Sequence, residues 1–286
     1  MPNRLFYDSH MHTPLCKHAF GEPEAYADRA IQAGLKGIIF TCHSPMPRGF
    51  WPHVRMSIKE FPEYVRIVDR AAKAYEGKLD IRLGMESDFF PGFEEWIAEL
   101  HTMAKFHYCL GSVHWQGQDY KARYETGSVE DFIATYFRLL AESAETGLFD
   151  CLAHPDLVKN YKPECWDFEA IRPIVAESLD RIAKTGVAME LNTSGLNKRY
   201  AAMNPGPEML AMMAERGIPV VIGSDAHVAQ RVGDRFRLAI NHLKAAGYST
   251  VRVYEERWPH VMRLDEIERT LLRQATELGN TSVEAA

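Results

Sequence analysis

Histidine is unusually frequent in this chain: 12 of its 286 residues are histidine, against 5 cysteines. Seven of these histidines and two acidic residues come soon after short apolar runs, and we regard these nine residues as candidate metal ligands. They are His10, His12, His18, His43, Glu86, His114, His154, Asp225 and His227. Imidazole and carboxylate groups are ligands that suit zinc, manganese and iron. Because a catalytic zinc ion uses about three protein ligands plus water, this set predicts two or three clustered ions.

Clustered ions indicate a particular chemistry. Two metal ions a few ångströms apart can clamp the attacking and leaving oxygens of an in-line displacement, as phosphoester hydrolysis requires. We therefore expect a metal-dependent phosphomonoesterase in which a bridging hydroxide attacks the phosphorus of a small phosphorylated substrate. Glu86 and Asp225 would be part of the catalytic machinery, with Glu86 bridging two ions. The leaving alkoxide would take its proton from Asp88 or from metal-bound water, and the sequence leaves both open.

Cationic side chains near the ions would stabilise the charge on the phosphoryl oxygens. Arginine offers a planar fork for phosphate, whereas lysine acts as a point charge. The candidates are Arg55, Lys159, Lys198 and Arg199, with Arg231 as a weaker one. For each of them a solvated surface charge is an equally good interpretation.

Seven short apolar runs must position these side chains, and each is typical of a strand buried on both faces. The runs span residues 5–7, 37–41, 81–85, 108–111, 151–153, 187–191 and 220–223. Amphipathic stretches with apolar residues three or four apart lie between them and predict helices, for example at 93–103 and 132–140. Glycines that can end a helix follow such stretches. They are Gly34, Gly77, Gly147, Gly186, Gly217 and Gly247.

A repeated order of strand, helix, glycine and strand is typical of parallel βα units. Seven such strands without an obvious linker favour one closed α/β barrel, a single domain over residues 1–286, rather than two open-sheet domains. The C-terminal ends of all strands in such a barrel meet on one face, where barrel enzymes build their sites. The candidate ligands are therefore expected on that face. From about Asn280 onward we expect a frayed tail.

Composition narrows the class of protein. Apolar residues make up 46% and charged residues 25% of the chain, which is typical of a soluble globular protein. A net charge of −6 argues against a broad nucleic-acid-binding surface. We expect no signal peptide, no disulfide framework and no membrane span, because no apolar run comes near the roughly 20 residues that a span needs. We expect a cytoplasmic protein without a membrane partner, and both a monomer and a homo-oligomer stay open.

Other functions for the same ligands also stay open. A nuclease or a different phosphoesterase would use the same metals on another phosphate ester, because a barrel does not fix its substrate. A non-enzymatic metal-binding or regulatory module would hold metal too, although all nine ligand positions are filled. Amidohydrolase barrels also carry a His-x-His pair after the first strand. They usually offer a bridging lysine, and no lysine follows a strand here.

An ordered series of motifs resembles the PHP (polymerase and histidinol phosphatase) superfamily, and above all its histidinol-phosphatase branch. The similarity covers roughly residues 5 to 250. Its motifs begin at Asp8-Ser-His10-Met-His12, His43-Ser-Pro45, Gly84-Met-Glu86-Ser-Asp88, Gly111-Ser-Val-His114, Ala153-His154-Pro-Asp, Glu190-Leu-Asn192 and Gly223-Ser-Asp225-Ala-His227. The resemblance implies a distorted (β/α)7 barrel. It also implies hydrolysis of L-histidinol phosphate to L-histidinol and phosphate, in histidine biosynthesis.

The resemblance further implies a trinuclear metal centre with three groups of ligands. One ion would bind His10, His12, Glu86 and Asp225; a second Glu86, His114 and His154; and a third His18, His43 and His227. The chain departs from the family pattern at two places. Cys42 stands where family members commonly have aspartate, and it is expected to be a small buried residue. After Gly195-Leu the chain reads Asn197-Lys198-Arg199 instead of Arg-Lys.

Overall fold

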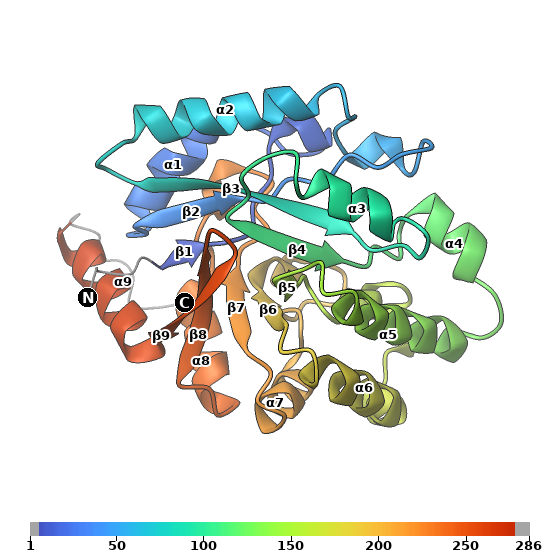
Figure 1. Ribbon diagram of the computed structural model, residues 1–286. Coiled ribbons are helices and arrows are strands. Elements are labelled where there is room, and N and C mark those ends of the chain that lie inside the picture. Colours follow the sequence, from blue (N-terminus) through green and yellow to red (C-terminus); the bar gives the residue numbers. More distant parts are fainter. Residues whose placement is uncertain (1–5, 278–286) are drawn as a thin grey trace.

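Seven parallel strands form a sheet that curls into a barrel (Figure 1). The computed structural model describes residues 6–277. The strands follow one another around the barrel in chain order, and each pairs with the next. They are β1 Tyr7–Asp8, β2 Gly37–Phe40, β3 Asp80–Asp88, β4 Tyr108–Ser112, β5 Cys151–Leu152, β6 Ala188–Asn192 and β7 Val220–Gly223. The predicted (β/α)7 barrel is confirmed, and every predicted apolar run overlaps one strand.

Helices lie between the strands and cover the outside of the barrel, as Figure 1 shows. They are α1 Pro23–Gln32, α2 Phe61–Ala74, α3 Glu94–Leu100, α4 Gln118–Tyr124, α5 Val129–Glu145, α6 Phe168–Ala183, α7 Pro207–Glu215 and α8 Phe236–Ala245. The apolar stripe predicted at 132–140 lies within α5, and the one predicted at 93–103 overlaps α3, which is shorter at both ends. All six predicted helix-ending glycines have positive φ, as the left-handed helix end requires. The expected frayed tail from Asn280 lies outside the described residues.

The barrel closes between β1 and β7 through the chain just beyond these two strands. The backbone N–H of His12 donates to the carbonyl of Ala226 at 2.9 Å. The buried carboxylate of Asp8 accepts hydrogen bonds from the backbone N–H groups of Ser224, at 3.0 Å, and Gly233, at 2.9 Å. Buried N–H groups are costly to leave unpaired, so this carboxylate stabilises the closure. We call this region the barrel seam.

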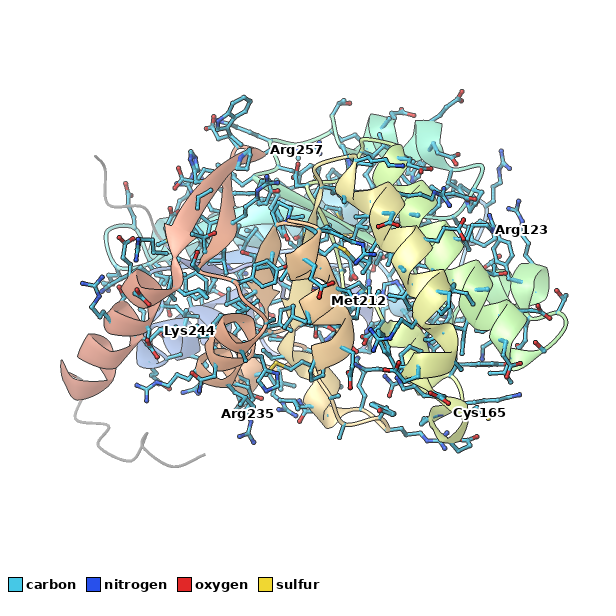
Figure 2. The ribbon with its side chains drawn as sticks, turned by 90° about the horizontal axis from the view of Figure 1, so that it is seen from below. Arg123, Cys165, Met212, Arg235, Lys244 and Arg257 are labelled. Carbon is cyan, nitrogen blue, oxygen red and sulfur yellow. The ribbon has the colours of Figure 1, made fainter. Side chains whose placement is uncertain are left out.

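An antiparallel hairpin, β8 (Thr250–Glu255) and β9 (Trp258–Arg263), follows the barrel and leads into α9 (Leu264–Glu277). The sequence patterns do not predict this hairpin. Arg257, in its turn (Figure 2), lies 3.1 Å from the carboxylate of Asp150, at the N-terminal end of the barrel strands. The Tyr254 hydroxyl donates to the Asp150 carbonyl at 2.8 Å. Among the described residues, no helix is long and apolar enough to cross a membrane.

Candidate metal centre

Glu86 lies in the middle of a cluster of histidines at the C-terminal end of the strands. It is fully buried near the end of β3. Its Oε1 lies 3.5 Å from His114 Nε2 and 3.0 Å from His154 Nε2. Its Oε2 lies 2.8 Å from His43 Nδ1 and 3.6 Å from His10 Nε2. With different histidines facing its two oxygens, this carboxylate has the arrangement of a group that bridges two ions.

His10, His12 and Asp225 form a second part of the cluster. The Nε2 atoms of the two histidines are 3.2 Å apart. Asp225 Oδ1 lies 3.2 Å from His12 Nε2 and 3.6 Å from His10 Nε2. Tetrahedral ligands with metal bonds of about 2.0–2.1 Å are separated by roughly 3.3 Å. The donor atoms therefore have the spacing and the chemistry that fit one transition-metal ion.

His18 and His227 form the third part, with Nε2 atoms 2.9 Å apart. The Nδ1 of His18 lies 2.8 Å from the Cys16 carbonyl, and that of His227 lies 3.0 Å from the Asp225 carbonyl. A neutral ring whose Nδ1–H donates to a carbonyl presents the lone pair of Nε2. The ring centroid of His43 lies 5.4 Å from that of His18. All nine candidate ligands thus come together at one end of the barrel.

Two further carboxylates lie behind ligand rings. Glu190 Oε1, in β6, is 2.7 Å from His10 Nδ1, and Asp88 Oδ1, in β3, is 2.6 Å from His114 Nδ1. Such acceptors fix the tautomer of a ligating histidine and raise its basicity. No task was predicted for Glu190, and a different one was predicted for Asp88. Two signals in the sequence could have pointed to these carboxylates. Each ligating imidazole needs an acceptor for its other ring nitrogen. Side chains alternate between the two faces of a strand, so Asp88 lies on the same face of β3 as Glu86.

Asp88, one of the two candidates for protonating the leaving group, is held in a buried ion pair. The side chain is only 2% exposed, and Oδ2 lies 2.6 Å from Arg55 Nη1. Although burial raises the pKa of Asp88, the charges of Arg55 and His114 outweigh burial and hold it below its usual value. One carboxylate oxygen thus faces His114 and the other faces Arg55. Its geometry is that of a group that orients His114.

Two of the predicted phosphate-binding cations are buried in ion pairs. The Arg55 guanidinium is held by Asp88 and donates to the Ser44 carbonyl at 3.0 Å. The Lys159 ammonium lies 3.1 Å from the carboxylate of Asp156 and is 1% exposed. Neither side chain lines the pocket at the candidate centre. Each of these two cations is thus paired with a buried carboxylate.

The other cations lie differently. Lys198 lines the pocket. Burial raises the pKa of Asp225, but the charge of His10, the hydrogen bond to His12 and, more weakly, the charges of His227 and Lys198 hold it well below its usual value. Arg199 is exposed and lies 3.5 Å from Glu164, away from the pocket lining. Arg231 pairs with the acidic side chain three residues further on. Of the cations considered, Lys198 is the one that the fold brings to the centre.

The pocket lies directly over the cluster. Besides candidate ligands, its wall includes an indole, two aliphatic side chains, an amide and an ammonium group. The lining consists of His18, His43, Trp51, Val54, His114, Gln116, His154, Leu157, Lys198, Asp225 and His227. A small molecule in this pocket would contact the donor atoms of the cluster.

Backbone strain marks the same region. His154 has φ of 29° and Asp225 has φ of 52°, a conformation that non-glycine residues rarely adopt. At Gly223, an added Cβ would lie 2.0 Å from Glu190 Oε1 and 2.7 Å from His10 Cβ. Only glycine therefore lets Glu190 reach His10. Strained positions of this kind persist where the surrounding structure determines them and are frequent at functional sites.

Protonation divides the histidines of the cluster. Burial lowers the pKa of His43 to about 4 and that of His227 to about 2. Burial also acts to lower the pKa of His12, but hydrogen bonds to Asp225 and Cys42 and the charge of Glu86 raise it to about 9. Some rings of this cluster thus hold a proton at neutral pH. Metal binding would replace such protons, because ligating imidazoles must be neutral.

Cys42 is buried behind His12, as expected of a small core residue. Its Sγ accepts a hydrogen bond from Thr13 Oγ1 at 3.2 Å. The sulfur atoms of Cys16 and Cys42 and a ring nitrogen of His12 lie within 4.8 Å of one another. The thiol therefore lies beside the ring where the resemblance leads one to expect a carboxylate.

Five histidines remain. Among the described residues, none of these five forms an ion pair with Glu86 or Asp225, unlike His10, His12 and His43. His101, for example, lies 3.0 Å from the Ser87 hydroxyl, at the side of β3. This agrees with a structural or solvated role for His53, His101, His107, His242 and His260.

Comparison with known proteins agrees with this geometry. A model of the PHP domain family matches residues 8–194. A protein of Deinococcus radiodurans named "Probable histidinol-phosphatase" is 39% identical over 251 residues, which cover 85% of this chain and 95% of that protein. The histidinol-phosphatase of Bacillus subtilis is 29% identical, and the aligned part covers 79% of this chain and 95% of the Bacillus subtilis protein.

A solved structure has the same fold. It is the histidinol phosphate phosphatase of Lactococcus lactis in complex with zinc, L-histidinol and phosphate. It superimposes with a TM-score of 0.76 at 21% identity, covering 89% of this chain and 98% of that one. The family match, the relatives and the shared barrel lead to one conclusion. This chain belongs to the PHP domain family.

Proposed function

We propose that this protein is a metal-dependent phosphatase that hydrolyses L-histidinol phosphate to L-histidinol and phosphate. The observation that carries the proposal is the cluster of histidines around the bridging carboxylate of Glu86, with a pocket over it. The substrate is supported by the relatives named histidinol-phosphatase and by the L-histidinol and phosphate in the related structure.

The donor atoms fit two or three divalent ions of zinc, manganese or iron. Their ligands would be His10, His12, Glu86 and Asp225 for one ion, Glu86, His114 and His154 for a second, and His18, His43 and His227 for a third. Such ions, when bound, supply Lewis acidity that activates water and neutralises charge on the phosphoryl oxygens. Zinc is the metal present in the related structure.

The chain's own residues orient and hold the substrate. Glu190 and Asp88 fix the rings of His10 and His114. Lys198, on the pocket wall, offers its ammonium to a phosphoryl oxygen as a point charge. It is the one lysine or arginine among the described residues of this wall. A polynucleotide needs several phosphate contacts for its affinity, so this pocket favours a small monoester.

The test is release of phosphate from L-histidinol phosphate by metal-loaded protein, with zinc, manganese and iron compared. Loss of a residue that hydrogen-bonds to a metal ligand typically lowers activity or metal affinity by about 10–100-fold. His114→Ala removes a ligand itself, so it should lower the rate of phosphate release by at least about 100-fold. The matched control is His242→Ala on α8, outside the cluster, which should behave as the parent protein.

Two results would count against the proposal, and they differ. Full activity of His114→Ala would contradict the metal assignment. Turnover of other monoesters without release from L-histidinol phosphate would contradict the substrate alone. Metal content of each variant, measured by elemental analysis, separates loss of ions from loss of fold.

A further inference from the structure

Arg55 is a buried cation in the segment that links β2 to α2, and its side chain is 2% exposed. A buried charge is costly unless it is paired and hydrogen-bonded, so its partners show what holds it there. Its Nη1 lies 2.6 Å from Asp88 Oδ2, and Asp88 Oδ1 lies 2.6 Å from His114 Nδ1. A chain of two close contacts therefore leads from Arg55 to a candidate metal ligand.

The same guanidinium also holds residues 44–55, which we call the wall segment. Its Nη1 donates to the Ser44 carbonyl at 3.0 Å, and its Nε donates to the Trp51 carbonyl at 3.1 Å. Its Cζ lies 5.4 Å from the ring centroid of Phe50 and 5.8 Å from that of Trp51, within cation–π range. One side chain thus fixes both the beginning and the middle of the wall segment.

The wall segment forms part of the pocket over the cluster. Trp51 and Val54 line this pocket together with His114. Trp51 has φ of 38°, and such a conformation persists only where the surrounding structure determines it. The hydrogen bond from Arg55 to the Trp51 carbonyl is part of that surrounding structure. Arg55 therefore contacts both the pocket wall and the carboxylate behind a metal ligand.

We propose that Arg55 is a positioning residue that couples the wall segment to His114 through Asp88, an inference that rests on the proposed function. The guanidinium fixes one oxygen of the carboxylate and so directs the other oxygen to the ring of His114. The wall segment cannot move away from the pocket without drawing the guanidinium from Asp88. A planar guanidinium donates from several nitrogens in fixed directions, whereas a lysine ammonium is a single point of charge.

The first test is the affinity for zinc, measured by chelator competition. Loss of a group that orients a ligating histidine costs about 10–100-fold in metal affinity, and we expect a loss of that size in both Arg55→Met and Asp88→Asn. The double variant should lose no more than the weaker-binding single variant, because both changes act on His114 by one route. Independent effects would add instead.

Two further variants separate this role from general damage to the fold. Arg55→Lys keeps the charge and should restore part of the zinc affinity that Arg55→Met loses. If Arg55→Met does not fold, Arg55→Lys and Asp88→Asn carry the same comparison. Arg66→Met is the matched control, since it removes an arginine from an exposed ion pair with Glu63 and should leave zinc affinity unchanged.

The second test separates the two partners of Arg55 by kinetics at saturating zinc. Arg55→Met frees the wall segment and should raise KM for L-histidinol phosphate by roughly 2–10-fold, the size expected for one lost hydrogen bond. Asp88→Asn leaves both hydrogen bonds to the wall segment in place and should raise KM less. A general loss of structure would change KM in both variants alike.

The outcomes distinguish this inference from the proposed function. If the parent protein binds zinc and hydrolyses L-histidinol phosphate, then an unchanged zinc affinity in Arg55→Met, or additive losses in the double variant, overturns the coupling alone. An unchanged KM in Arg55→Met overturns the part played by the wall segment. If the parent protein neither binds zinc nor hydrolyses the ester, the proposed function fails and the coupling fails with it.

Discussion

At the scale of single residues, the histidines differ in what lies behind them. His10 has Glu190 at Nδ1 and His114 has Asp88, whereas His18 and His227 have backbone carbonyls. The ligands could be predicted because each follows an apolar run along the chain. Their acceptors could not, since Glu190 and His10 are 180 residues apart and meet only through packing.

The carboxylate behind His10 provides a test at this scale. Glu190→Gln removes the charge and weakens the acceptor of the His10 ring. Groups that accept a hydrogen bond from a ligating histidine contribute about 10–100-fold to metal affinity. We expect a loss of that size in zinc affinity, measured by chelator competition, with the fold preserved by circular dichroism. Glu145→Gln, which alters an exposed pair with Arg181, should leave the affinity unchanged. Equal affinities for all three proteins would contradict the role of Glu190.

Protonation of the centre predicts how metal affinity depends on pH. The pKa of His12 is raised to about 9 in the metal-free protein, and a ligating imidazole must be neutral. At pH 7 this ring therefore carries a proton that metal must displace, so affinity should rise as the pH increases from 7 toward 9. Calorimetry in two buffers of different ionisation enthalpy should detect proton release at pH 7. A signal independent of the buffer would show that the ring is already neutral.

At the scale of elements, a strand that is buried on both faces can be predicted from the sequence, whereas an exposed strand cannot. The seven barrel strands form short apolar runs, which is why each was predicted. In β9 most residues are exposed, and Trp258 is 71% exposed, so the strand has no buried apolar run to detect. The same limit applies to the barrel seam, because the hydrogen bonds of Asp8 depend on closure of the whole sheet.

The end of β7 offers a test of how elements position the centre. Gly223→Ala adds a methyl carbon only 2.0 Å from Glu190 Oε1 and should displace that carboxylate from His10. We expect weaker zinc binding and lower phosphatase activity, both by at least about 10-fold, as for loss of the carboxylate itself. Gly206→Ala is the control, since its added Cβ would make contacts of only 3.6 and 3.7 Å. Identical behaviour of the two variants would show that the strand end yields without disturbing the centre.

At the scale of the whole molecule, the proposed ions should stabilise the barrel, because their ligands lie at or beyond the ends of six of its seven strands. A ligand at 100 times its Kd adds about 2.7 kcal/mol to the free energy of unfolding. At about 2 °C or more per kcal/mol for chains of this size, two such ions should raise Tm by roughly 10 °C. Calorimetry with and without a chelator, followed by readdition of zinc, measures the effect. An unchanged Tm would argue against a bound metal cluster.

The barrel seam also bears on how the protein is made. The carboxylate of Asp8 meets Ser224 across 216 residues of chain, and the loop beyond β7 carries Asp225 and His227. Synthesis proceeds from the N-terminus, so a nascent chain that has not yet produced β7 lacks both ligands and cannot close. Assembly of the proposed metal centre is thereby tied to completion of the barrel, and we expect a chain that ends before β7 to lack phosphatase activity.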